Sequence, residues 1–337
     1  MIFKKIFKTL LVIFSSLCVL AVILLAYFNL PVKNNENKAK LGVTFSSRYA
    51  QDIGLDWKEA YIAVLDDIGA KKVRIPVYWD LSEPEEGKYD FSDIDWQLAE
   101  AEKRNAEIIL VIGQKVPRWP ECFIPEWAGI SDEKRKGSLI KFVSAAAEHF
   151  KNYPAVKFWQ IENEPFLNFG VCPEKDYNLV DEEIYALRKI DNSRKVIITD
   201  SGELSFWISA AKRADVFGTT MYRDVVSKKL GTIKYPIGPN FFKFKRFIIH
   251  LFANQDNVAV VELQGEPWMD GWTINFPLEN QLESMNEEKL KDNVQFAKNT
   301  GISDIYLWGA EWWYYLKVEK NYPNVWEEAK NIFEKNN

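Results

Sequence analysis

In the stretch EIILVI at residues 107–112, five apolar residues follow one another without any alternation of polar side chains. A strand with this pattern is typical of a parallel sheet whose two faces are both covered by helices. Seven further strand candidates occur after residue 40, namely 41–45, 72–78, 156–162, 195–200, 215–220, 258–262 and 304–308. We therefore predict eight parallel strands.

Amphipathic stretches separate these strands, with apolar residues at helical spacing. We predict helices over 57–68, 92–103, 131–150, 181–190, 203–213, 241–253, 286–298 and 324–334. Eight strand–helix pairs within residues 41–337 match the size of a (β/α)8 barrel, so the predicted fold is an α/β TIM barrel. An open doubly wound sheet is the alternative, but no glycine-rich phosphate loop follows the first strand.

The composition is that of an ordinary globular protein, since 47% of the 337 residues are hydrophobic and 27% are charged. The formal net charge of −5 argues against a nucleic-acid-binding protein, which normally carries a basic face. The 13 Trp and 14 Tyr residues offer flat faces with a polar edge, which suit stacking on sugar rings. We expect a monomer with no nucleic-acid partner.

The N-terminus carries an uncharged stretch, TLLVIFSSLCVLAVILLAYFNL at residues 9–30, directly after three lysines. It is long enough to cross a membrane as one transmembrane helix, and the preceding lysines place the N-terminus in the cytoplasm. The predicted segments are a cytoplasmic 1–8, a transmembrane signal anchor 9–30, a tether 31–40 and an extracytoplasmic domain 41–337. A cleaved signal peptide, which would give a secreted form, is the alternative, although no convincing small-x-small cleavage site follows.

Two cysteines, Cys122 and Cys172, lie outside the apolar N-terminal stretch, in segments that we expect to be loops at the same end of the fold. In an exported domain they have the conditions to form a disulfide. Two unrelated thiols are the other interpretation, and the sequence leaves both open.

Two glutamates, Glu164 and Glu262, follow the fourth and seventh predicted strands. In a TIM barrel the active site lies at the carboxyl ends of the strands, so these side chains are expected to meet. Five more polar or aromatic residues lie at or near other strand ends, namely Arg74, Trp79, Gln114, Tyr222 and Trp308. Two facing carboxylates suit glycoside hydrolysis, in which one protonates the departing oxygen and the other attacks or activates water.

Each carboxylate has a neighbour that competes for its role. Glu162 lies on the same side of an ideal strand as Glu164, so the strand must end or bulge near residue 162 for Asn163 and Glu164 both to face the pocket. Glu266 in ELQGEPW competes with Glu262, but its flanking Gly and Pro place it in a loop, where it is instead a candidate for contacting substrate. Arg74 has a purely structural alternative, as a partner for charges inside the barrel.

Three motifs resemble those of clan A glycoside hydrolases, the (β/α)8 retaining enzymes that include family 5: the Asn-Glu-Pro of 163–165, VRIPVYW at 73–79 and EPEEGKYDFSDID at 83–95. The resemblance implies that Glu164 is the acid/base and Glu262 the nucleophile. It further implies that Asn163 binds the sugar 2-hydroxyl. By the same resemblance, Arg74 supports the nucleophile, Tyr222 donates a hydrogen bond to it, and Trp308 lies beneath the sugar. Tyr222 and Trp308 could instead be ordinary aromatic residues of the core.

The chain departs from family 5 in its histidines, because such enzymes usually carry them in the active site. Only His149 and His250 are present, and both fall in helix-like runs. This predicts a divergent clan A family, acting like β-galactosidases or xylosidases. It also argues against a metal-dependent hydrolase, which needs several His or Asp ligands at strand ends, so we expect no cofactor and no metal.

The predicted function is therefore that of a membrane-anchored retaining β-glycosidase acting on an oligo- or polysaccharide. A non-catalytic carbohydrate-binding or cell-envelope scaffold protein on the same barrel is the alternative. The stretch KYPIGPNFFKFKRFIIHLF at 234–252 mixes basic and aromatic residues, which fits either an ordinary barrel helix or a helix on a membrane surface near the anchor. We favour the barrel helix.

Overall fold

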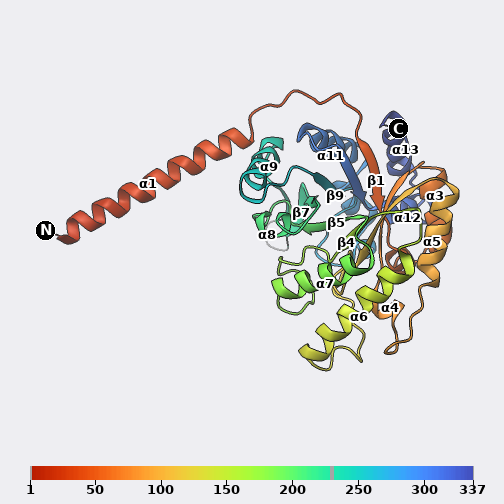
Figure 1. Cartoon of the computed structure of the whole chain (residues 1–337). Helices are drawn as coiled ribbons and strands as arrows, with labels where there is room; N and C mark the ends of the chain where they lie inside the picture. Colours follow the sequence, from red (N-terminus) through yellow and green to blue (C-terminus); the bar gives the residue numbers. More distant parts are fainter. Residues whose placement is uncertain (1, 228–230, 337) are drawn as a thin grey trace.

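The computed structural model describes residues 2–227 and 231–336, and it contains a closed barrel of parallel strands surrounded by helices (Figure 1). The predicted TIM barrel is confirmed. Around the barrel the strand order is β1-β10-β9-β6-β5-β4-β3-β2. The strands are β1 Lys40–Thr44, β2 Lys72–Pro76, β3 Glu107–Ile112, β4 Val156–Ile161, β5 Lys195–Asp200, β6 Val216–Met221, β9 Val258–Gln264 and β10 Asp304–Trp308.

The helices on the outside of the barrel are α3 Trp57–Asp66, α5 Ser92–Lys103, α6 Asp132–Phe150, α7 Tyr177–Ile190, α8 Ile208–Ala211, α9 Pro239–Ala253, α11 Glu287–Asn299 and α13 Asn324–Asn336. Shorter elements lie in the connections: α2 Ser47–Asp52, α4 Trp79–Ser82, η1 Thr273–Asn275, α10 Leu278–Ser284, α12 Ala310–Glu319, and a hairpin of β7 Asp224–Ser227 with β8 Gly231–Lys234. These connecting elements are not among those predicted from the sequence.

The helix predicted over 203–213 is wrong for most of its length, because only Ile208–Ala211 is helical. Trp207 adopts a left-handed backbone with φ 69°, which interrupts a helix at that point. Its indole N–H donates to the carbonyl oxygen of Ser201 at 2.8 Å, so the segment before α8 is a folded turn. β9 continues to Gln264, two residues past its predicted end, since its last residues pair with β10.

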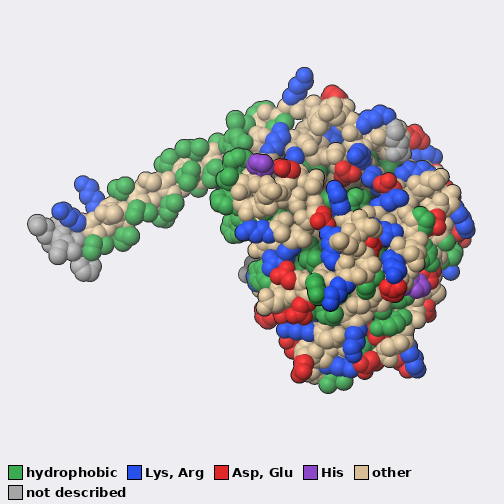
Figure 2. Space-filling view, in the orientation of Figure 1, with side chains coloured by type: hydrophobic (Ala, Val, Ile, Leu, Met, Phe, Trp, Pro, Cys, Tyr) green, Lys and Arg blue, Asp and Glu red, His purple; other side chains and the backbone are tan. Residues whose placement is uncertain are grey.

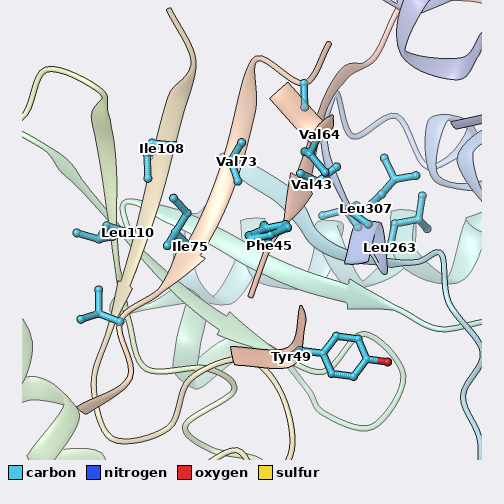
Figure 3. Packing of buried hydrophobic residues seen from close by; sticks show 14 of the residues in the cluster. Val43, Phe45, Tyr49, Val64, Val73, Ile75, Ile108, Leu110, Leu263 and Leu307 are labelled. Carbon is cyan, nitrogen blue, oxygen red and sulfur yellow. The ribbon is translucent and has the colours of Figure 1, made fainter. Parts of the chain in front are cut away.

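The strands bury side chains on both faces, as their unbroken apolar sequences predict. Figure 3 shows part of the main cluster, in which Val73 and Ile75 of β2 lie near Ile108 and Leu110 of β3. A separate buried group is formed by Ile109, Ile197 and Tyr306. Complete burial of one such aliphatic side chain stabilises the fold by about 1.5–3 kcal/mol.

A glycine is required in β1 where this strand packs against the ring of Tyr306. A Cβ at Gly42 of β1 would lie 2.6 Å from the ring of Tyr306 in the neighbouring β10. Any larger residue would push the two strands apart and disturb the closed barrel beneath the site.

The N-terminal helix α1, Ile2–Phe28, projects away from the barrel beside α9 (Figure 1). Its segment Lys5–Phe28 is long and apolar enough to cross a membrane, as an anchor or a signal peptide. The helix ends at Phe28, two residues before the predicted end of the span. The following segment is bound to the domain, because the Asn35 backbone N–H donates to Asn299 Oδ1 at 2.9 Å and the Ala39 N–H donates to Asn336 Oδ1 at 2.9 Å.

Cys122 and Cys172 form a disulfide with an S–S distance of 2.08 Å. The bond joins the loop after β3 to the loop after β4. Of the two interpretations that the sequence left open, the structure contains the bridge.

Candidate active site

The turn after β4 places Asn163 and Glu164 at the mouth of the barrel. β4 ends at Ile161, and both Glu162 and Glu164 adopt left-handed backbone conformations, with φ 56° and 45°. Such a conformation costs a non-glycine residue on the order of 1–3 kcal/mol. Two backbone hydrogen bonds hold the turn: Asn163 N–H donates to Lys115 O at 2.6 Å, and Glu164 N–H donates to the Thr199 hydroxyl at 2.8 Å.

Glu162 is turned away from its neighbour by this backbone. Its carboxylate accepts from the backbone N–H of Gln114 at 2.9 Å and of Lys115 at 2.7 Å. Burial raises the pKa of Glu162, and burial together with the charge of Glu162 raises the pKa of Glu183 on α7. Glu162 therefore holds the loop after β3 in place.

Glu164 is a buried carboxyl with a raised pKa. Only 7% of the residue is exposed, and its Oε1 accepts from the Thr220 hydroxyl at 3.2 Å. Burial raises its pKa well above the usual value, and the nearby charges of Glu262 and Glu121 add to the shift. A raised pKa favours the protonated form of this carboxyl, which is the form that a general acid requires.

Glu262 lies within β9 and is held by two donors. Arg74 of β2, which is fully buried, donates from Nη1 to Oε1 at 2.8 Å, and the Tyr222 hydroxyl donates to Oε2 at 3.0 Å. Burial and the charge of Glu262 raise the pKa of Tyr222, so the phenol keeps the proton that it donates. One hydrogen bond from a cationic donor and one from a neutral donor orient this carboxylate.

Asn163 connects the two sides of the site. Its Oδ1 accepts from Arg74 Nη2 at 2.7 Å, and its Nδ2 donates to Glu121 Oε2 at 3.2 Å. Both oxygen and nitrogen of the amide are thus engaged, which sets the orientation of the group.

Glu121 is a third carboxyl at the site, and it was not predicted from the sequence. Burial and the charge of Glu262 raise its pKa to about 8. It lies in the loop after β3, nine residues beyond the end of that strand, so position at a strand end gave no signal. The neighbouring Cys122, whose disulfide draws this loop toward the loop of Glu164, was the available clue.

Trp308 and Glu266 form a second cluster with Arg118. The indole N–H of Trp308 donates to Glu266 Oε1 at 2.8 Å, and Arg118 forms ion pairs with Glu266 and Glu311. The guanidinium lies 4.1 Å from the Trp308 ring centroid and 3.7 Å from that of Tyr49. Arg118 therefore takes up stacking area on the Trp308 ring. Among the described residues, Glu266 Oε2 is one of the buried side-chain atoms without a hydrogen-bond partner.

Two residues of the predicted strand-end group have other partners. Trp79 is fully buried, stacks on Phe142 and donates to Glu83 Oε2 at 2.7 Å. Gln114 accepts from Arg135 Nη1 at 2.5 Å on α6. Both interactions draw these side chains toward the helices.

The two histidines lie on helices and pair with aspartates, His149 with Asp95 at 2.7 Å and His250 with Asp256 at 2.8 Å. Within residues 2–227 and 231–336, no three His, Cys, Asp or Glu side chains come together in a way that could hold a metal ion.

Comparisons with known proteins agree with this architecture. The family model described as cellulase (glycosyl hydrolase family 5) matches residues 34–333. A curated relative, the β-galactosidase BgaA of Clostridium cellulovorans, is 28% identical over 166 residues, which are 43% of this chain and 25% of the relative. The chain thus matches only a quarter of that protein's length.

Two solved structures show the same fold. One is a β-galactosidase from the psychrophilic Marinomonas ef1, with a TM-score of 0.56, 12% identity, and 87% of this chain and 59% of the other covered. The other is an exo-β-1,4-mannosidase from Opitutaceae bacterium strain TAV5, with a TM-score of 0.55, 15% identity, and coverage of 80% and 52%. At these identities the likeness concerns the fold alone, and the chain spans little more than half of each protein.

Proposed function

The chain belongs to glycosyl hydrolase family 5, the cellulase family, and is therefore a glycosidase; on this premise we propose that it hydrolyses β-glycosides with retention of configuration. Glu164 acts as the acid/base and Glu262 as the nucleophile. The observation that carries the proposal is the difference between the two carboxyls: Glu164 has a raised pKa, whereas Glu262 is bound by Arg74 and Tyr222.

The expectation of a family outside family 5 was wrong. It rested on the scarcity of histidines, but the family match extends over residues 34–333, although both histidines in this range lie on helices and pair with aspartates. In this chain Thr199, Thr220 and Glu121 provide the hydrogen bonds around Asn163 and Glu164.

Catalysis proceeds by two displacements. In the first, a Glu262 oxygen attacks the anomeric carbon while Glu164 gives its proton to the departing glycosidic oxygen, which leaves a glycosyl ester on Glu262. In the second, Glu164 takes a proton from a water molecule whose oxygen attacks the same carbon, and the ester bond breaks. Arg74 and Tyr222 stabilise the Glu262 carboxylate when it is released.

The substrate is positioned by the groups around this pair. Asn163 is the candidate for the sugar 2-hydroxyl, and Glu266, which binds the indole N–H of Trp308, is the candidate for a contact with another hydroxyl. Trp308 offers the part of its ring that Arg118 leaves uncovered.

A panel of aryl β-glycosides tests the function, with galactoside, glucoside, mannoside and xyloside compared beside cellulose and mannan. We expect turnover of at least one aryl β-glycoside, with the β-anomer of the sugar as the first product seen by NMR. The α-anomer as first product would contradict retention. Binding of a glycan without hydrolysis would favour the carbohydrate-binding alternative.

Glu121 supports the reaction through Asn163. We expect Glu121→Ala to lower kcat/KM by about tenfold, because the buried Asn163 amide loses an acceptor. Glu121→Gln is expected to stay within about twofold of the wild type at pH 7, since a protonated carboxyl and an amide offer the same acceptor. Steady-state kinetics on an aryl β-glycoside measures both. A Gln variant as defective as the Ala variant would contradict this role.

We further infer that the enzyme is a single-pass membrane protein with a cytoplasmic N-terminus. The segments are 1–8, 9–30, 31–40 and the catalytic domain 41–337. The length and composition of α1 support the anchor, and the Cys122–Cys172 disulfide supports an oxidising, extracytoplasmic location for the domain. A cleaved α1 would instead yield a secreted enzyme.

A further inference from the structure

Helix α9 packs one apolar face against the barrel and exposes further apolar side chains to the outside. Phe242 and Ile249 are fully buried, as a barrel helix requires. Phe247, Leu251 and Phe252 are nevertheless 57%, 60% and 56% exposed. We refer to these three residues as the outer stripe. Single exposed apolar residues are ordinary on a protein surface, but three large ones on one short segment call for a cause.

The end of α1 packs against the same side of α9. Phe28 lies against Phe241 and Phe244, with ring centroids 5.2 and 5.7 Å apart. A helix turns by about 100° per residue, so residues 244, 247 and 251 fall within about 60° of one another around the α9 axis, and residue 252 lies about 20° from residue 241. The outer stripe is therefore the continuation, along α9, of the surface that holds Phe28.

Polar contacts fix this junction. Asn240 Nδ2 donates to the Tyr27 carbonyl oxygen at 3.2 Å, and Asn29 Nδ2 donates to the Pro236 carbonyl oxygen at 3.0 Å. A Cβ at Gly238 would collide with the Phe28 carbonyl oxygen, so the glycine permits the close approach. Together with the bonds of the 31–39 segment to α11 and α13, these contacts hold the domain at a set orientation to α1.

The charge of α9 is the opposite of that of the whole chain. The helix contains Lys243, Lys245 and Arg246 but neither Asp nor Glu, whereas the chain has a net charge of −5. Lys245 is buried, while Lys243 and Arg246 are half-buried. A helix with exposed Phe and Leu beside basic groups is suited to the boundary between the headgroups and acyl chains of an anionic bilayer.

The position of α1 indicates that a membrane lies beside the outer stripe of α9. If the Lys5–Phe28 segment spans the hydrocarbon, Phe28 lies at its outer boundary, and the outer stripe begins at that depth. In Figure 2 hydrophobic side chains continue from α1 onto the adjoining edge of the domain, where Figure 1 places α9.

We propose that the outer stripe of α9 rests in the surface of the bilayer that holds α1, so that the catalytic domain lies against the membrane on its α9 side. This inference rests on the proposed anchoring by α1. The stripe buries its apolar side chains among the outer acyl chains, and Lys243 meets anionic headgroups, whereas Arg246 is held by the carbonyl oxygen of Thr300 at 3.2 Å.

Lipid-borne quenchers test the proposal on the full chain in phosphatidylcholine–phosphatidylglycerol vesicles. A fluorophore is placed on Leu251→Cys or, as the control, on Val318→Cys of α12, both in a Cys18→Ser background; Val318 is 46% exposed. The native Cys18, which lies within α1, reports on the anchor when labelled in the wild type. We expect a nitroxide near the headgroup to quench residue 251 at least about twofold more than residue 318.

The outcomes separate the two proposals. Quenching of Cys18 by a nitroxide deep in the acyl chains, with residue 251 no more quenched than residue 318, overturns the surface contact and leaves the anchor intact. No quenching at Cys18 overturns both. If the fluorescence at residue 251 changes with the amount of protein per vesicle and not with the amount of lipid quencher, the stripe is a contact between copies of the chain. That result also overturns the proposal.

Charge substitutions provide a second measurement. Phe247→Glu combined with Phe252→Glu is expected to abolish the excess quenching at residue 251, because two carboxylates oppose insertion among anionic lipids. Tyr185→Glu on α7, at a side chain that is 62% exposed, is the matched control and should leave it unchanged. Undiminished quenching in the double variant contradicts the proposal.

Discussion

Replacing Glu262 by Gln is expected to lower kcat on an aryl β-glycoside by on the order of 10⁴-fold or more. The amide retains the shape of the side chain but lacks the charge that forms the glycosyl ester. Arg74 then faces a neutral partner at 2.8 Å, so some loss of stability accompanies the loss of rate. The measurement is steady-state kinetics on the folded variant, with thermal unfolding recorded in parallel.

Glu183→Gln is the matched control for this variant. Glu183 is also a fully buried glutamate, but it lies on α7 and contacts neither Arg74 nor Tyr222. We expect it to retain activity of the same order as the wild type. Glu266→Gln separates the rival assignment of the nucleophile: if this variant, and not Glu262→Gln, eliminates turnover, the roles of the two glutamates must be exchanged.

Replacing Glu164 by Gln is expected to lower kcat/KM by about 10²–10⁴-fold on substrates whose leaving group needs a proton. The pH profile carries the sharper prediction. In the wild type, kcat/KM falls as pH rises through the raised pKa of Glu164, because the acid form disappears. In Glu164→Gln this alkaline limb should be absent when a nitrophenyl glycoside, whose leaving group needs no proton, is the substrate.

Azide distinguishes the two carboxyls directly. With Glu164→Ala, azide needs no general base and attacks the glycosyl ester on Glu262, which should release the β-glycosyl azide. With Glu262→Ala, azide takes the place of the missing nucleophile and should give the α-glycosyl azide. The reverse pairing of products and variants would show that Glu262 is the acid/base.

Much of the barrel was predictable because parallel strands covered on both faces have nearly uninterrupted apolar sequences. EIILVI became β3 with its predicted bounds, and DIYLW became β10 with its predicted bounds. The helix after β5 was not predictable in this way, because the left-handed conformation of Trp207 depends on a hydrogen bond to Ser201. Local apolar spacing carries no information about such a turn.

Some residues of the candidate site could also be predicted from the sequence, and others could not. Tyr222 and Glu262 could be named in advance from their places at or near the ends of predicted strands. Arg74 and Asn163 could be named from the motifs VRIPVYW and Asn-Glu-Pro. Glu121 could not, since it reaches Asn163 through a long loop that a disulfide ties to the next loop. Trp308 was placed near the site, but the sequence gives no sign that Arg118 stacks on it.

The sequence by itself determined the closed parallel barrel, the two glutamates at strand ends and an apolar N-terminal helix, since a local pattern of side chains predicts each of them. Only the tertiary structure decided that Glu162 turns away while Glu164 is buried with a raised pKa, that Glu121 joins the site, and that the outer stripe of α9 continues the surface holding Phe28. These features depend on distances between residues far apart in the chain. The pKa of a carboxyl depends on its burial and on nearby charges, and both depend on which distant residues the fold brings next to it.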